Sequence, residues 1–167
     1  DLVRSRGLGD VYKRQPSFRP DKAVNISKPG FAEYIGKLAA SVGKDSLDSV
    51  EDVCAALTQR LEFFHKLGCR ASDHGLDYVP FRPASPKKAN EAFQKAMAGE
   101  ELSTKEAERY QTAILLHLGR EYHRLDIAMQ LHYSCLRNMN ERMFARMGPD
   151  TGFDMIAQNS CGGAIAR

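Results

Sequence analysis

GCRASDHG at residues 68–75 and IAMQLH at residues 127–132 decide the fold of this chain. Each segment follows an amphipathic helical stretch and stops where polar side chains replace apolar ones, which predicts a strand that leads into a loop. Parallel β/α folds place their chemistry at such strand ends. The two segments therefore predict a β/α repeat and also the place of a functional site.

Two helices are expected before the first strand. Helical periodicity covers residues 31–42 and, more strongly, residues 50–67. Ser49 is a suitable N-cap for the second helix, and Gly68 is suited to end it in a left-handed conformation. The first strand is then expected at residues 69–72, with a long proline-divided loop after it.

Two further helices are expected between the strands. Pro86 is placed as the first helical residue after Ser85, and that helix continues to Gly99. The STKE sequence at residues 103–106 forms a capping box that opens the other helix. The second strand follows this helix, so helices and strands alternate along the chain.

The complete order predicts an α/β fold with a parallel sheet. An extended segment at residues 16–20, with a loop beginning at Asp21, precedes the elements above, and a last helix is expected near residues 140–147. A parallel barrel has eight strands and typically about 250 residues, whereas this chain has 167. We expect only an arc of such a barrel, belonging to a longer protein.

Composition and charge exclude several classes of protein. The net charge is +3. Residues 1–15 contain four basic and two acidic side chains and so supply +2 of this charge. We interpret residues 1–15 as non-native junction sequence or a disordered leader, and residues 16–167 as the barrel fragment. The nearly neutral remainder argues against a nucleic-acid partner. No apolar run approaches the roughly 18 residues of a membrane span.

The cysteines and histidines form no recognisable metal motif. The chain has no H-x-H, no H-E-x-x-H and no cysteine pair at zinc spacing, and it also lacks a G-x-G-x-x-G loop. Its four cysteines are spread out without C-x-x-C spacing, which favours free thiols over a disulfide framework. These features favour a reducing, cytoplasmic location.

Asp73 and His74 are the first candidate site residues. A carboxylate and an imidazole at a strand end can exchange a proton or hold a ligand, and Gly75 beside them permits close approach of the backbone. The alternative is that Asp73 only caps a turn while His74 points into solvent.

His132, Arg137 and Arg19 are the other candidates. His132 ends the second strand, where a histidine can also be a satisfied core residue. A guanidinium binds a carboxylate through two parallel hydrogen bonds, so Arg137 and Arg19 predict an acidic small-molecule substrate. The alternatives are an ion pair of Arg137 with Glu141, four residues along a helix, and an exposed loop position for Arg19.

Five segments, in order, resemble one family. The chain is similar to glucuronate (uronate) isomerases from about residue 16 to its end. The matching segments are RPDK at 19–22, GCRASDHG at 68–75, MQLH at 129–132, LRN at 136–138 and MGPDTGFD at 147–154. Two departures, YSC at 133–135 and NMN at 138–140, bear on substrate preference more than on the reaction.

The resemblance implies a (β/α)8 TIM barrel of the metal-dependent hydrolase type, in the amidohydrolase superfamily. It implies an aldose-ketose isomerase that interconverts D-glucuronate and D-fructuronate, and D-galacturonate and D-tagaturonate, by moving a proton between C2 and C1. Asp73 and His132 match catalytic positions, and Arg19 and Arg137 match substrate-binding positions, with His74 as a further substrate contact. The group that removes the C2 proton is not assigned.

The resemblance also implies a divalent metal, commonly zinc, in the full-length parent. Its ligands would be an H-x-H pair and a late aspartate, which lie outside this chain. We therefore expect the fragment alone to bind no metal, to be inactive and to be poorly stable. The parent's homo-oligomeric state stays open. The alternatives are a metal-dependent hydrolase of the same superfamily and a non-enzymatic helical interaction module.

Overall fold

The computed structural model describes residues 16–149, 151–158 and 162–166. The expectation for residues 1–15 lies outside the described residues. The elements in chain order are α1 (Asp21–Val24), α2 (Phe31–Ser41), α3 (Val50–Lys66), β1 (Ala71–Gly75), α4 (Pro86–Met97), α5 (Thr104–Arg124), β2 (Ala128–His132), β3 (Cys135–Leu136), α6 (Glu141–Met147), β4 (Met155–Ile156) and α7 (Gly162–Ile165).

The sheet that carries the candidate site is parallel, as the sequence predicts. β1 and β2 pair in register from Ala71 opposite Ala128 to Gly75 opposite His132. The extended segment before α1 lies on the other side of β1, where Phe18 donates its N–H to the Ala71 carbonyl at 3.2 Å. Within the described residues these segments do not close into a barrel. Three carboxyl ends of parallel segments therefore meet at one edge.

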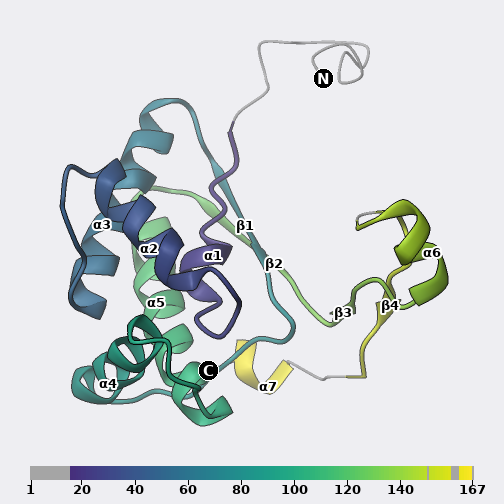
Figure 1. The fold of residues 1–167 in the computed structure, drawn as a ribbon. Helices are drawn as coiled ribbons and strands as arrows, with labels where there is room; N and C mark the ends of the chain where they lie inside the picture. Colours follow the sequence, from purple (N-terminus) through teal and green to yellow (C-terminus); the bar gives the residue numbers. More distant parts are fainter. Residues whose placement is uncertain (1–15, 150, 159–161, 167) are drawn as a thin grey trace.

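Helices α2 to α5 gather on one side of β1 and β2 (Figure 1), and the core lies between these layers. Phe93 and Tyr110 are fully buried there and stack with their ring centroids 6.0 Å apart. Phe31 meets both rings edge to face. The Tyr110 hydroxyl donates to the Ala23 carbonyl at 2.8 Å, which ties α5 to α1. The aromatic cluster thus joins α1, α2, α4 and α5.

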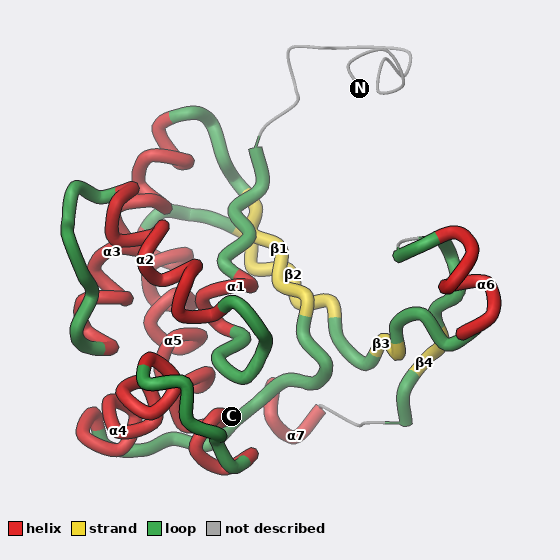
Figure 2. The backbone as a smooth tube through the Cα atoms, viewed as in Figure 1, coloured by secondary structure: helices red, strands yellow, loops and turns green. Residues whose placement is uncertain are grey.

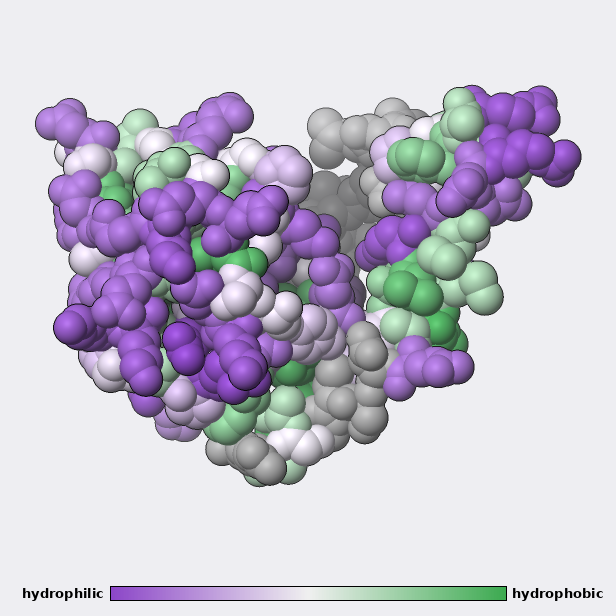
Figure 3. Space-filling model, turned by 60° about the horizontal axis from the view of Figure 1, so that its bottom comes forward, coloured by the Kyte–Doolittle hydropathy of each residue, from purple (hydrophilic) through white to green (hydrophobic). Residues whose placement is uncertain are grey.

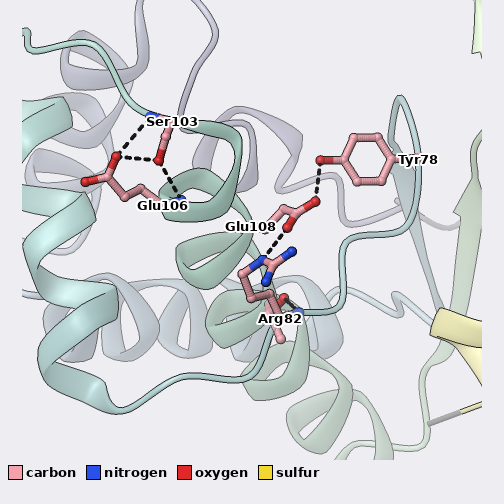
Figure 4. Close-up of polar contacts among 6 residues, drawn as sticks. Tyr78, Arg82, Ser103, Glu106 and Glu108 are labelled. Carbon is pink, nitrogen blue, oxygen red and sulfur yellow. Dashed lines mark hydrogen bonds and ion pairs between the residues drawn. The ribbon is translucent and has the colours of Figure 1, made fainter.

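The caps expected from the sequence are confirmed at two helices. The Ser49 hydroxyl accepts the Asp52 N–H at 3.0 Å at the start of α3. At the start of α5, Ser103 and Glu106 form both bonds of the capping box, as Figure 4 shows. Pro86 opens α4 as expected, although Ser85 makes no side-chain cap bond. These starts could be predicted because each depends on neighbours within three residues.

The long loop after β1 is fastened to α5. The Tyr78 hydroxyl donates to Glu108 Oε1 at 3.0 Å, and the Arg82 side chain pairs with the other oxygen of the same carboxylate (Figure 4). The backbone N–H of Arg82 donates to Thr112 Oγ1 at 2.8 Å. Burial of the Tyr78 phenol and its bond to Glu108 raise its pKa to about 12. The loop is therefore held in place despite its lack of regular structure.

A separate arm, residues 135–149 and 151–156, extends away from the helices and the parallel strands (Figures 1 and 2). β3 and β4 pair antiparallel at its base, and α6 has no buried residue. Apolar side chains gather on this part of the surface, as Figure 3 shows. Ile156 is 89% exposed and Met155 is 60% exposed. Few contacts within the described residues stabilise the arm.

Two expectations are corrected, and one strand pairing was not expected. The first strand was expected at residues 69–72, but β1 runs Ala71–Gly75, because pairing with β2 continues to His132. Asp21 begins the short helix α1 rather than a loop. The two-stranded pairing of β3 with β4 was not expected. None of the helices in the described ranges is long and apolar enough to cross a lipid bilayer.

Replacing Phe93 by alanine should remove about 3–5 kcal/mol from the free energy of unfolding, because the cluster around a fully buried ring cannot collapse to fill the cavity. Urea denaturation followed by circular dichroism measures the change. Phe63→Ala is the matched control, since Phe63 is 47% exposed and its loss should change stability by less than about 1 kcal/mol. Equal losses for both variants would contradict this placement of the core.

Candidate active site

Arg19, Asp73 and His132 converge at the carboxyl ends of the three parallel segments. Arg19 Nε lies 2.9 Å from Asp73 Oδ2, and His132 Nδ1 lies 3.1 Å from Asp73 Oδ1. The Asp73 side chain is 17% exposed, whereas the side chains of Arg19 and His132 are more than half exposed. Asp73 is therefore the centre of a cluster that is open to solvent through its two partners.

Asp73 offers one acceptor atom that no described group satisfies. Its Oδ1 is buried and has no hydrogen bond of good geometry. His132 Nδ1 is close enough to this oxygen for an ion-pair contact, but its direction does not make a hydrogen bond. A buried polar atom without a well-directed partner is unfavourable. A ligand hydroxyl would supply the missing bond if the exposed His132 side chain moved away from this oxygen.

Asp21 is a fourth member of the cluster that the sequence analysis missed. Its Oδ1 accepts the Gly75 N–H at 2.9 Å, and its Oδ2 lies 3.7 Å from Arg19 Nη2. Burial raises the pKa of Asp21, while the Gly75 N–H and Arg19 oppose that rise. Asp21 lies inside the RPDK segment, two residues after Arg19, and its partner Gly75 is distant in sequence.

His74 lies on the opposite face of β1 from Asp73, because successive strand residues point to opposite sides. Its side chain is fully buried, and the Tyr122 hydroxyl of α5 lies 3.1 Å from its Nε2. Nδ1 has no hydrogen-bond partner among the described residues. Burial lowers the pKa of His74 to about 4, although Asp73 opposes this. The structure therefore does not bring His74 to the Asp73 cluster.

Arg137 lies in the arm and not in the strand-end cluster. Its Nη1 pairs with Asp154 Oδ2 at 2.6 Å, and the Asn138 N–H donates to the other oxygen of Asp154 at 3.1 Å. These contacts join the two sides of the arm near β3 and β4. The ion pair that the structure shows for Arg137 is therefore with Asp154, in place of the alternative with Glu141.

Comparison with known proteins shows the family of this chain. The family model for glucuronate isomerase matches residues 10–167. The chain belongs to this family. The uronate isomerase of Clostridium acetobutylicum is 43% identical over 152 residues, which cover 91% of this chain and 32% of that protein. The uronate isomerase of Caldicellulosiruptor saccharolyticus is 47% identical over 144 residues, 86% of this chain and 31% of that protein.

Two solved structures are similar to this member of the glucuronate isomerase family. The uronate isomerase of Thermotoga maritima has a TM-score of 0.78 and 30% identity, over 86% of this chain and 32% of that one. The glucuronate isomerase of Caulobacter crescentus has a TM-score of 0.77 at 22% identity, over 91% and 31%, and shows the fold alone. The chain spans about a third of the length of the relatives that it matches.

The divalent metal that the resemblance implies has no centre in the described part of the chain. There, no group of three or more histidine, cysteine, aspartate or glutamate side chains could hold a metal ion. Asp73 and His132 supply two donors, but the positive Arg19 lies against the same carboxylate. A cation beside Asp73 opposes the binding of a second one. These residues do not fit a metal centre.

Buried His74 should make stability pH-dependent. The unfolded chain binds a proton on His74 below its usual pKa of 6.5, whereas the folded chain does so only near its pKa of about 4. The unfolded state therefore binds more protons in this window. The free energy of unfolding should fall as the pH falls through it, by up to about 1.4 kcal/mol per pH unit.

Urea denaturation at several pH values across this window measures the slope for the wild type and for His74→Gln. The variant should lose most of this dependence because its amide does not titrate. His123→Gln replaces an exposed histidine on α5 and should leave the slope unchanged. A wild-type slope that His74→Gln does not reduce would show that other groups cause it.

Proposed function

We propose that this chain is part of an isomerase that interconverts D-glucuronate and D-fructuronate, and D-galacturonate and D-tagaturonate. The proposal includes an arc of a (β/α)8 barrel, supported by the parallel β1–β2 pair and the similarity to the Thermotoga maritima structure. The observation that carries it is the convergence of Arg19, Asp73 and His132 on one sheet edge. Membership of the glucuronate isomerase family supports a uronate as the substrate.

The reaction moves one proton between neighbouring carbons without net oxidation. The C2–H bond breaks, its electron pair forms a C1–C2 double bond, and the former carbonyl oxygen on C1 takes a proton. The resulting enediol then loses the proton of its C2 hydroxyl and gains one at C1, which leaves a ketone at C2. Such a reaction needs groups that accept and return protons while the chain of the sugar acid is held still.

The site residues divide these tasks according to their chemistry. The Arg19 guanidinium is suited to bind the uronate carboxylate, and Arg137 is a second candidate for this contact if the arm lies over the site. Asp73 and His132 handle protons or position hydroxyls, and the unsatisfied Asp73 Oδ1 is an acceptor for a substrate hydroxyl. His74 is fully buried against Tyr122 on the other face of β1. In this scheme it supports the strand and does not contact the substrate.

The proposal extends to a divalent metal, zinc by resemblance, held by residues outside the described part of this chain. No step above is assigned to it. A cytoplasmic location is supported by the free thiols of Cys54, Cys69 and Cys135. The partner is a small-molecule uronate. A helical interaction module is less well supported, because it required the strand predictions to be wrong and β1 and β2 are present.

Asp73→Asn in the full-length protein should lower kcat/KM for D-glucuronate at least about 100-fold, because the amide neither accepts a proton nor pairs with Arg19 as a carboxylate does. Initial rates of D-fructuronate formation measure the effect. Glu33→Gln makes the same chemical change at an exposed ion pair with Lys37 and should leave kcat/KM unchanged. Full activity of Asp73→Asn would overturn the assignment of Asp73.

Residues 16–167 expressed alone should not isomerise D-glucuronate, whereas the full-length protein should. The reason is that the cluster is more than half exposed at Arg19 and His132, and water competes with every contact that orients a substrate. The same rate assay compares the two proteins at equal concentration. Turnover by the segment alone would refute the expectation that the site is incomplete within these residues.

A further inference from the structure

Asp21 connects two of the three segments that form the candidate active site. It is the first residue of α1, directly after the segment that carries Arg19. Its carboxylate accepts the N–H of Gly75, which ends β1 and lies opposite His132 in the sheet. The bond spans 54 positions of sequence. Asp21 thereby fastens the end of β1 to the segment that positions Arg19.

The side chain of Asp21 is not a cap of its own helix. Pro20 is the N-cap of α1, and no side-chain cap bond is present there. The carboxylate instead turns toward β1, where it accepts the Gly75 N–H. A Cβ built on Gly75 would lie 3.4 Å from Asp21 Oδ2, which is an ordinary van der Waals contact. The local structure therefore favours the long-range bond.

The Arg19 guanidinium lies between two carboxylates. Its Nε contacts Asp73 at 2.9 Å, and its Nη2 faces Asp21 at 3.7 Å. These two nitrogens belong to the same edge of the guanidinium plane. A guanidinium has five N–H donors in a fixed fork, and a second edge is formed by Nη1 and Nη2. Holding the first edge against protein carboxylates leaves the second edge for a substrate carboxylate.

We propose that Asp21 is a positioning residue of this site, which orients Arg19 so that its outer edge binds the carboxylate of the uronate. This inference rests on the proposed isomerase function. Asp21 does not touch the reacting carbons in this scheme. It acts through Arg19, and its bond to Gly75 keeps Arg19 in register with Asp73 on the neighbouring strand.

The surroundings of Asp21 explain why its charge matters. It is only 24% exposed at the side chain, and burial raises its pKa. The groups that interact with its charge are Arg19, Asp73, His132, Tyr34 and Tyr122. A protonated Asp21 still accepts the Gly75 N–H but attracts Arg19 less strongly. Binding of the uronate should therefore weaken as the pH falls through the folded pKa of Asp21.

Asp21→Asn in the full-length protein separates the two contacts, because the amide oxygen can still accept the Gly75 N–H while the negative charge is lost. KM for D-glucuronate should rise about tenfold with kcat within about threefold, as expected when ground state and transition state lose the same contact. The acid-side rise of KM that we expect for the wild type should be absent from this variant. Asp77→Asn removes an exposed carboxylate that pairs with Lys28 and should change neither constant.

A double-mutant cycle with Arg19→Met tests whether Asp21 acts through Arg19. Asp21→Asn should raise KM no further in the Arg19→Met background, because the group that it orients is gone. Equal effects in both backgrounds would overturn the inference and assign Asp21 a general structural role. If Asp21→Asn does not fold by circular dichroism, Asp21→Glu, which keeps the charge, replaces it in the cycle, and it too should have no effect without Arg19.

The activity of the wild-type protein distinguishes the proposed isomerase function from the proposed role of Asp21. If it does not convert D-glucuronate, the proposed isomerase function fails and the role of Asp21 fails with it. If it does convert D-glucuronate but Asp21→Asn leaves KM and its pH profile unchanged, only the positioning role is overturned. A raised KM that depends on Arg19 supports both.

Discussion

The candidate site depends on the parallel pairing of β1 with β2 on one side and with the Phe18 segment on the other. Parallel neighbours end at the same edge, so Arg19, Asp73 and His132 meet there although 113 positions separate the first from the last. The register of this pairing also decides which residue of β1 belongs to the candidate site. A shift of one residue would turn Asp73 toward the helices and place its neighbours at the edge instead.

The opposite face of β1 is as constrained as the site. Ser72 and His74 are fully buried there, and the His74 ring packs edge to face on Tyr122 of α5 at 5.6 Å between centroids. Helix α5 also carries Tyr110, whose hydroxyl donates to the Ala23 carbonyl of α1. One helix therefore contacts both β1 and α1 on the side away from the candidate site. The core therefore fixes the strand whose other face carries Asp73.

Local signals in the sequence predicted helix starts correctly, and long-range contacts explain what was missed. Ser49 and Ser103 could be identified because their partners lie three residues away. The end of β1 depends on its pairing with β2, and ending the strand at Ser72 made His74 look like a loop residue. Asp21 was missed because its partner Gly75 is distant in sequence. The identities of Arg19, Asp73 and His132 were available, but not the distances between them.

Arg19 resolves an electrostatic conflict that the strand pairing creates. Bringing Asp21 and Asp73 to the same edge sets two partly buried carboxylates near one another. Burial raises the pKa of Asp21, and the negative charge of Asp73 adds to that rise. A cation beside both offsets this repulsion, and Arg19 contacts each of them. The same contacts orient its remaining N–H groups outward. The residue that reduces the repulsion between these two carboxylates is therefore also the one that we propose to bind the substrate carboxylate, so one side chain would serve both stability and the proposed substrate binding.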